Sequence, residues 1–269
     1  MMQQYGLIGR QIQHSLSPKL QNAMFAQEHL DANYTLFDIE SNYFETNITQ
    51  LLSQLSGANV TMPYKQQIMP YLDDVSDMAR ETASVNTLYY DQRGRLIGDT
   101  TDGAGFWWAV AQLPLTQTIN QVLLIGCGGA ARSIMAAKPN EINLTVASRN
   151  SENFSRNQVV VDRLLQIPLQ ALSAISLADY DLIIDATPVG MFDETSILTT
   201  QQIAQIPKTG IVIDLKYNKK ITPLMALAQQ HVPAFNGLGM LVGQGGLSHE
   251  LWTGYRPELS ELMKVIDEG

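Results

Sequence analysis

Residues 121–132 read QVLLIGCGGAAR, an apolar run that passes directly into a glycine-rich turn. The run 121–125 is typical of a strand buried on both faces of a parallel sheet. Gly126, Gly128 and Ala131 then match the spacing G-x-G-x-x-G/A, and a helix is expected to follow. In that setting the glycines allow a tight turn and a close backbone approach to a pyrophosphate, which the helix N-terminus attracts. The stretch therefore predicts a dinucleotide-binding turn, and a tight turn without a ligand is the alternative.

The pattern of strands and helices continues on both sides of this turn. Apolar strands are expected at 143–147, 182–184 and 211–213, alternating with helices, which predicts a doubly wound parallel sheet. The segment before it shows a βαβα pattern and a hairpin. Its expected strands are 5–9, 34–39 and 57–61, its helices run from Pro18 to Leu30 and from a cap at Ser41, and the hairpin pairs 85–90 with 95–98. Two helices separated by Gly254 and Pro257 are expected at the end.

Length and charge limit the function classes. The chain has 269 residues, with 17 Lys and Arg against 26 Asp and Glu, a net charge of −9. An acidic chain without a run of basic residues is a poor candidate for binding nucleic acid or an anionic membrane surface. Cys127 is the only cysteine, which excludes an intrachain disulfide and fits a reducing compartment. Without a signal-peptide pattern at residues 1–5 or a run of about 18 apolar residues, a cytoplasmic protein is expected.

The residues after the second strand of the parallel sheet bear on the choice of cofactor. NAD-binding proteins usually place an acidic residue there, but the sequence reads Ser148, Arg149, Asn150. A guanidinium suits the additional phosphate of NADP by charge and by geometry. NADP is therefore favoured over NAD, and a solvated Arg149 at a strand end is the alternative.

Several polar residues of the first segment are candidates for chemistry. Ser15 and Ser17 stand beside an expected helix start, where they could donate to a small carboxylate or Ser17 could simply cap the helix. Lys65 follows an expected strand and is compatible with an exposed position. Asn86 interrupts an expected strand, where asparagine is disfavoured, and Asp102 could cap a helix.

Together these blocks resemble the shikimate dehydrogenase family, over nearly the whole chain and in the family's order. The blocks are His14–Pro18 with Asn22, Asn59–Lys65, Ser84–Thr87, Thr101–Gly103, the Gly126 turn, Thr187–Met191 and Gly237–Gln244. The resemblance implies two domains, a Rossmann-type sheet and an α/β substrate domain, with the active site in the cleft between them. The substrate domain would be 1–103, to which helices of 239–269 return, and the NADP domain 104–238.

The family's activity is implied in the same way. It interconverts 3-dehydroshikimate and shikimate with NADP(H), within aromatic amino-acid biosynthesis by way of chorismate. The catalytic pair would be Lys65, which exchanges a proton with the substrate oxygen, and Asp102. The residues that would bind substrate are Ser15, Ser17, Asn59, Thr61, Lys65, Asn86, Asp102, Tyr217 and Gln244. Those that would bind the cofactor are Gly126, Cys127, Gly128, Gly129, Ala130, Ser148, Arg149, Met191, Leu215 and Gly237.

Departures from the family's pattern leave two alternatives open. Ser148, Asn150, Asn153 and Asp185 differ from the usual residues around the cofactor, and Thr100 and His249 differ elsewhere. These changes permit a paralogue that acts on quinate or a related cyclic polyol acid, such as a quinate or shikimate dehydrogenase that uses NAD. A binding module that has lost turnover is the other alternative, and the retention of Lys65 and Asp102 argues against it. No metal is expected, because the four histidines lack ligand spacing. A monomer or a homodimer is compatible with the sequence.

Overall fold

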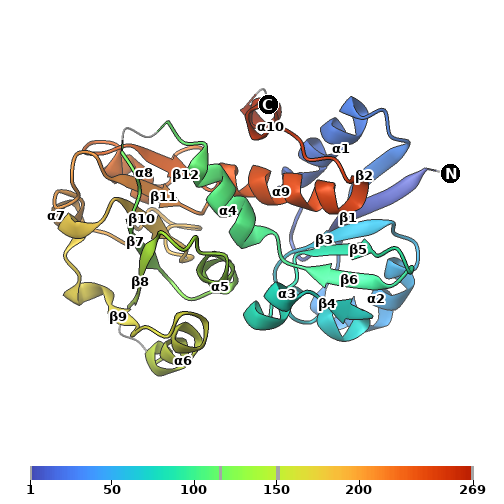
Figure 1. The fold of residues 1–269 in the computed structure, drawn as a ribbon, viewed down its shortest axis with the longest axis horizontal. Coiled ribbons are helices and arrows are strands. Elements are labelled where there is room, and N and C mark those ends of the chain that lie inside the picture. The colour runs from blue at the N-terminus through green and yellow to red at the C-terminus, as the bar shows by residue number, and fades with distance from the viewer. Residues whose placement is uncertain (1, 115–116, 150–151, 268–269) are drawn as a thin grey trace. The chain divides into compact units, whose positions relative to one another are not determined.

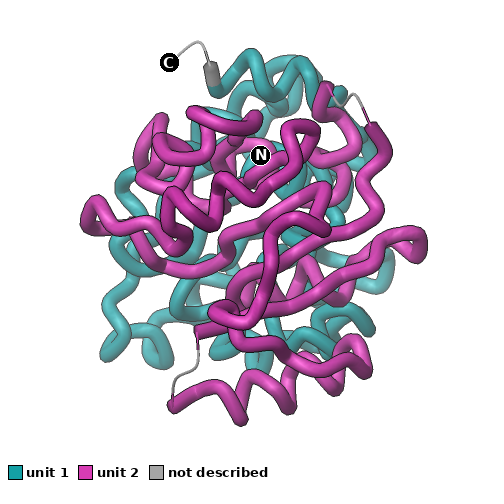
Figure 2. The backbone as a smooth tube through the Cα atoms, turned by 90° about the vertical axis from the view of Figure 1, so that its left-hand side faces the viewer, with its two compact units in different colours: residues 1–105, 241–269 teal, residues 106–240 magenta. Residues whose placement is uncertain are grey.

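The computed structural model describes residues 2–114, 117–149 and 152–267. Asn150 lies outside the described residues. The chain divides into two compact units (Figure 2). Unit 1 comprises Met1–Gly105 and Leu241–Gly269, and unit 2 comprises Phe106–Met240. The chain leaves unit 1 within α4 (Asp102–Ala111) and returns to it within α9 (Leu238–Thr253).

Unit 2 is a six-stranded, wholly parallel sheet with the strand order β9-β8-β7-β10-β11-β12. Its strands are β7 (Gln121–Ile125), β8 (Asn143–Ser148), β9 (Gln170–Ala171), β10 (Leu182–Asp185), β11 (Ile211–Asp214) and β12 (Ala234–Asn236). Counted along the unit, this order is 3-2-1-4-5-6, the order of the doubly wound dinucleotide-binding fold. The predicted Rossmann-type sheet is confirmed, and the order of its strands reverses between β7 and β10.

The central strands of unit 2 are apolar on both faces, as their sequence predicts. Val122 and Leu124 enter one hydrophobic cluster, and Leu123 and Ile125 enter the other. Helices α5 (Gly129–Ala136) and α6 (Phe154–Leu165) supply residues to the first cluster. The second cluster takes residues from α7 (Thr200–Ile203) and α8 (Pro223–Ala228). Each face of the sheet is therefore covered by helices, and loops at the strand ends are left to bind ligands.

Unit 1 is a mixed six-stranded sheet in the order β2-β1-β3-β5-β6-β4, shown in blue and cyan tones in Figure 1. Its strands are β1 (Gln3–Gly9), β2 (Ala32–Asp38), β3 (Gly57–Val60), β4 (Asp74–Val75), β5 (Thr87–Tyr90) and β6 (Leu96–Asp99). β2 and β3 run parallel to β1, and β5 pairs antiparallel with both β3 and β6. The predicted hairpin is thus present as β5 and β6.

The helices of unit 1 are α1 (Ser17–Gln27), α2 (Phe44–Leu52), α3 (Asp77–Thr82) and α10 (Leu259–Asp267), in addition to parts of α4 and α9. The prediction that Ser41 caps a helix is wrong. Ser41 begins a short 3-10 helix that ends at Tyr43, and Tyr43 stands at the start of α2 without a capping side chain. Among the described residues, no helix has both the length and the apolarity that crossing a membrane requires.

Helices α4 and α9 approach each other closely within unit 1, at a pair of glycines. A Cβ atom added to Gly105 would lie 2.2 Å from the backbone nitrogen of Gln244. One added to Gly243 would lie 2.2 Å from the carbonyl oxygen of Gly105. Only glycine permits this approach, which brings the start of α4 beside the middle of α9.

Candidate active site

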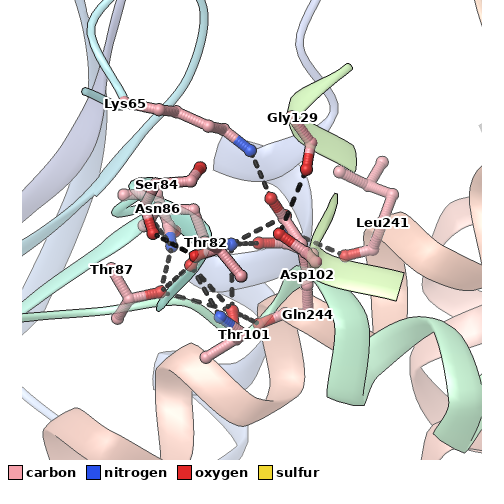
Figure 3. A network of polar contacts seen from close by, with 12 residues as sticks. Lys65, Thr82, Ser84, Asn86, Thr87, Thr101, Asp102, Gly129, Leu241 and Gln244 are labelled. Atoms are coloured by element: carbon pink, nitrogen blue, oxygen red, sulfur yellow. Dashed lines mark hydrogen bonds and ion pairs between the residues drawn. The ribbon is translucent and has the colours of Figure 1, made fainter. Parts of the chain in front are cut away.

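Lys65 and Asp102 form an ion pair in unit 1, as Figure 3 shows. The ammonium Nζ of Lys65 donates to Oδ2 of Asp102. The Lys65 side chain is 21% exposed and that of Asp102 is 7% exposed. Lys65 lies in the turn after β3, and Asp102 is the first residue of α4. The Lys65 side chain is therefore partly exposed, and its ammonium contacts one oxygen of a largely buried carboxylate.

Asn86 holds the other oxygen of that carboxylate. Its Nδ2 lies 2.8 Å from Oδ1 of Asp102 and 3.2 Å from Oε1 of Gln244 (Figure 3). Its own Oδ1 accepts from the backbone nitrogen of Thr101 at 2.8 Å. Asn86 stands just before β5, so the side chain that is unfavourable in a strand serves as a polar junction. The carboxylate is thereby fixed from two directions.

A buried group of hydroxyl side chains extends the hydrogen-bond network around Asn86. Ser248 lies within hydrogen-bond distance of Thr87 and Thr101, at 2.8 and 3.1 Å. Asn59 donates to Ser248 at 2.9 Å and accepts from the hydroxyl of Tyr34 at 2.8 Å. Both ends of the Asn59 carboxamide are therefore engaged in hydrogen bonds inside the unit.

The predicted substrate residues of unit 1 share one edge of its sheet. Ser15 and Ser17 follow β1, and Thr61 and Lys65 follow β3, its parallel neighbour. Asn86 precedes β5, which runs antiparallel to β3, so it lies at the same edge as these residues. The backbone carbonyl of Asn86 accepts from the backbone nitrogen of Val60 at 2.8 Å. Topology thus gathers residues that are far apart in the sequence.

The two serines interact with each other and do not cap α1. Ser15 Oγ donates to Ser17 Oγ at 3.1 Å and accepts from the Ser17 backbone nitrogen at 3.2 Å. The residue at the cap position is Leu16, which makes no side-chain capping bond. The two hydroxyls at this helix start are thus arranged as a pair that suits a small anion.

The glycine turn of unit 2 has the geometry of a phosphate cradle. Gly126 has φ +114°, a conformation that favours glycine, and a Cβ there would lie 3.0 Å from the carbonyl oxygen of Ala186. Gly128 caps α5, and a Cβ added to Gly128 or Gly129 would meet nothing within 4 Å. Open space therefore lies beside Gly128 and Gly129 at the start of α5, the helix end that also includes Ala130, and this fits the approach of a pyrophosphate.

Cys127 fills space within this turn. It is 7% exposed, and burial raises the pKa of its thiol to about 11. The side chain is therefore a neutral filler, and a contact with the cofactor would come from its backbone.

A group of arginines lies on the helices behind the glycine turn. Burial lowers the pKa of Arg132 below its ordinary value, and the positive charges of Arg163 and Arg156 lower it further. Within the described ranges, neither Arg132 on α5 nor Arg156 on α6 has a carboxylate partner. This arginine cluster was not predicted from the sequence, although Arg156 stands in the first turn of α6, the helix that follows β8.

The predicted cofactor residues Ser148 and Arg149 stand where β8 ends. Ser148, the last residue of β8, is 7% exposed, and its hydroxyl donates to the carbonyl of Arg149 at 3.3 Å. Arg149 is exposed. Asn153 stands at the start of α6 and makes no side-chain capping bond.

The other predicted cofactor residues, Met191, Leu215 and Gly237, follow the ends of β10, β11 and β12. Met191 follows Gly190, which has φ +79°. The backbone nitrogen of Gly237 donates to Lys216 at 3.1 Å, and a Cβ at Gly237 would lie 2.0 Å from the carbonyl of Leu215. Tyr217, predicted as a substrate contact, belongs to unit 2 and is 38% exposed. In the described part of the chain, no group of three His, Cys, Asp or Glu side chains could hold a metal ion.

Comparisons with known proteins agree with this arrangement. A family model for the shikimate dehydrogenase substrate binding domain matches residues 7–88. A shikimate dehydrogenase (NADP(+)) of Methanococcus maripaludis strain C6 is 34% identical over 97% of this chain and 95% of its own length. One of Bacillus cereus strain G9842 is 35% identical over 100% of this chain and 99% of its own.

A solved structure extends the comparison to three dimensions. The shikimate 5-dehydrogenase of Thermus thermophilus, in complex with NADP(H) and shikimate, superposes with a TM-score of 0.87 at 26% identity. The match covers 99% of each chain. With the sequence relatives above, this places the chain in the shikimate dehydrogenase family.

Proposed function

We propose that the protein interconverts 3-dehydroshikimate and shikimate with NADP(H), the activity named for its relatives, in aromatic amino-acid biosynthesis. The observation that carries the proposal is the Lys65–Asp102 ion pair, held from its other side by Asn86. Both groups belong to the edge of unit 1 where the serine pair also lies.

Lys65 is the group that exchanges the proton. NADPH, when bound, supplies the hydride that reduces the ketone carbon. The ammonium of Lys65 then donates a proton to the oxygen on which negative charge develops, and in the oxidation its amine accepts that proton. The ammonium suits the reduction because its charge also stabilises the developing alkoxide.

The neighbouring residues orient the substrate. The carboxylate of Asp102 accepts hydrogen bonds, so it reads a ring hydroxyl as a donor while it orients Lys65. Ser15, Ser17 and Thr61 offer neutral hydroxyl donors to the substrate carboxylate, and Gln244 offers an amide to a further hydroxyl. Neutral donors around one ion pair suit a ligand with one carboxylate and several hydroxyls.

NADP is favoured over NAD by charge. Arg132 on α5 and Arg149 and Arg156 after β8 belong to the β7-β8-β9 half of the sheet, in a chain whose net charge is −9. The additional phosphate of NADP carries negative charge that guanidinium groups bind well. We also place the protein in the cytoplasm, as a monomer or homodimer, in keeping with its single cysteine.

The experiment follows NADPH formation from shikimate, with quinate and NAD as the competing substrate and cofactor. Lys65→Ala should lower kcat by about 10²- to 10⁴-fold, the usual contribution of a positioned general acid or base, with little change in KM. Lys264→Ala, an exposed lysine on α10 of the same unit, is the matched control and should leave kcat unchanged. Absence of shikimate oxidation by the wild type, or more than half of kcat left in Lys65→Ala, refutes the proposal. Turnover of quinate with NAD alone would favour the paralogous activity.

A further inference from the structure

Unit 2 contains a buried cluster of three charged side chains that the reaction above does not use. Nζ of Lys216 lies 2.7 Å from Oδ2 of Asp185 and 2.7 Å from Oδ1 of Asp214. The lysine side chain is 3% exposed and both carboxylates are 0% exposed. One ammonium therefore serves two carboxylates.

The hydrogen bonds of the cluster suit the ionised form of both carboxylates. The second oxygen of Asp185 accepts from the backbone nitrogen of Thr187 at 2.9 Å. The second oxygen of Asp214 accepts from the hydroxyl of Thr222 at 2.6 Å. Burial raises the pKa of Asp185, while Lys216 and Thr187 act in the opposite direction. With donors on all four oxygens, the cluster carries one uncompensated negative charge.

The cluster stands where a ligand is expected in this fold. Asp185 and Asp214 are the last residues of β10 and β11 and are register partners. Asp185 is also the register partner of Ile125, the residue before Gly126. The carboxyl ends of these strands adjoin the point where the strand order reverses, which is the binding edge of doubly wound sheets.

The position of the cluster on that edge selects one part of the dinucleotide. Doubly wound sheets bind a mononucleotide on each half, and the glycine turn with the arginines occupies the half β7-β8-β9. The carboxylates belong to the other half, β10-β11-β12, with the Lys216 carbonyl bonded to Gly237. That half receives the nicotinamide, which is a cation when oxidised and neutral when reduced.

We propose that the Asp185–Lys216–Asp214 cluster tunes the protein toward the oxidised cofactor, its net negative charge stabilising the cationic nicotinamide over the neutral one. This inference rests on the proposed function, because it requires NADP to bind in the assigned direction. A buried charge acts through a medium of low effective dielectric, so it retains an effect that a surface charge would lose to solvent. The three residues act through charge and position, and none exchanges a proton with substrate.

The test compares the affinities of the two cofactor forms without turnover. Dissociation constants for NADPH are measured by fluorescence titration and those for NADP⁺ by calorimetry, in wild type and Asp185→Asn. We expect the ratio Kd(NADP⁺)/Kd(NADPH) to rise on the order of tenfold, because the substitution removes one buried negative charge that favours the cation. Should Asp185→Asn not fold, Asp214→Asn removes the same charge.

Asp181→Asn is the matched control. Asp181 precedes the same strand, β10, at its opposite end, where its carboxylate accepts from the backbone nitrogens of Asn120 and Gln121 at 2.9 Å each. It should leave the ratio within about twofold of wild type, since it is on the other edge of the sheet. Equal changes in both constants, an unchanged ratio in Asp185→Asn, or the same rise in Asp181→Asn overturns the inference. Binding of neither cofactor by wild type would instead refute the proposed function and the inference with it.

Discussion

The contact between α4 and α9 makes a sharp prediction for Gly243→Ala. The added Cβ would lie 2.2 Å from the carbonyl oxygen of Gly105, whereas ordinary contacts of a Cβ begin at 3.4 Å. The obstacle is backbone, so one helix must move by about 1 Å. Overpacking of this kind costs about 3 kcal/mol, and the better helix propensity of alanine returns about 1 kcal/mol. The expected net loss of about 2 kcal/mol lowers the Tm by about 4–8 °C.

The same substitution one turn earlier is the control. Gly239 lies on the same helix, but its added Cβ would lie 3.3 Å from a single side-chain atom, the Cβ of Ala109. Gly239→Ala should therefore leave the Tm unchanged or slightly raised. Thermal unfolding followed by circular dichroism measures both variants. Because Gln244 follows Gly243 and bonds Asn86, Gly243→Ala should also raise KM for shikimate. A Tm within 1 °C of wild type for Gly243→Ala, or an equal loss in Gly239→Ala, would refute the argument from close approach.

Three further outcomes are expected. Arg156→Gln should raise KM for NADP by about tenfold and leave KM for NAD unchanged, because it removes a charge that pairs with phosphate alone; equal changes for both cofactors would contradict this. Native Cys127 should react only slowly with iodoacetamide at pH 8, because burial raises the pKa of its thiol to about 11. Mass spectrometry follows the alkylation, and a rate equal to that of the unfolded chain would contradict this prediction. Burial lowers the pKa of His249 despite its contact with Glu28, so the unfolded chain takes up a proton more readily. The free energy of unfolding should therefore fall as the pH drops through about 6.5, and His249→Gln should reduce that slope in urea titrations.

The polar network of unit 1 explains why the site is held rigidly. Asn86, Thr101 and Ser248 come from three separate parts of the sequence and are buried, and Thr101 bonds both of the others. A buried polar group without a partner is costly, so each member requires the others. Buried side chains such as Thr101 and Ser248 therefore position the residues that are proposed to bind the substrate.

Many of the strands and turns of this protein can be predicted from its local sequence. Continuous apolar runs become β7, β10 and β11, and Gly126, with φ +114°, takes a conformation that favours glycine in the turn between β7 and α5. The hairpin of β5 and β6 follows from the residues around Gly94. These features depend on contacts between near neighbours, where hydrophobic period and turn chemistry act directly. The family's motifs also named the Lys65–Asp102 pair before its geometry was known.

Tertiary structure alone decided the rest. The strands β4 and β9 have two residues each and β12 has three, which is too short for any period to show, and they exist because a neighbouring strand offers its edge. The hydrogen bonds of Asn59 within unit 1 need Tyr34 and Ser248 as partners. The net charge of the cluster around Asp185 depends on Lys216 and Asp214 as well. Such roles depend on which distant segments become neighbours, and that is set by the packing of the whole sheet.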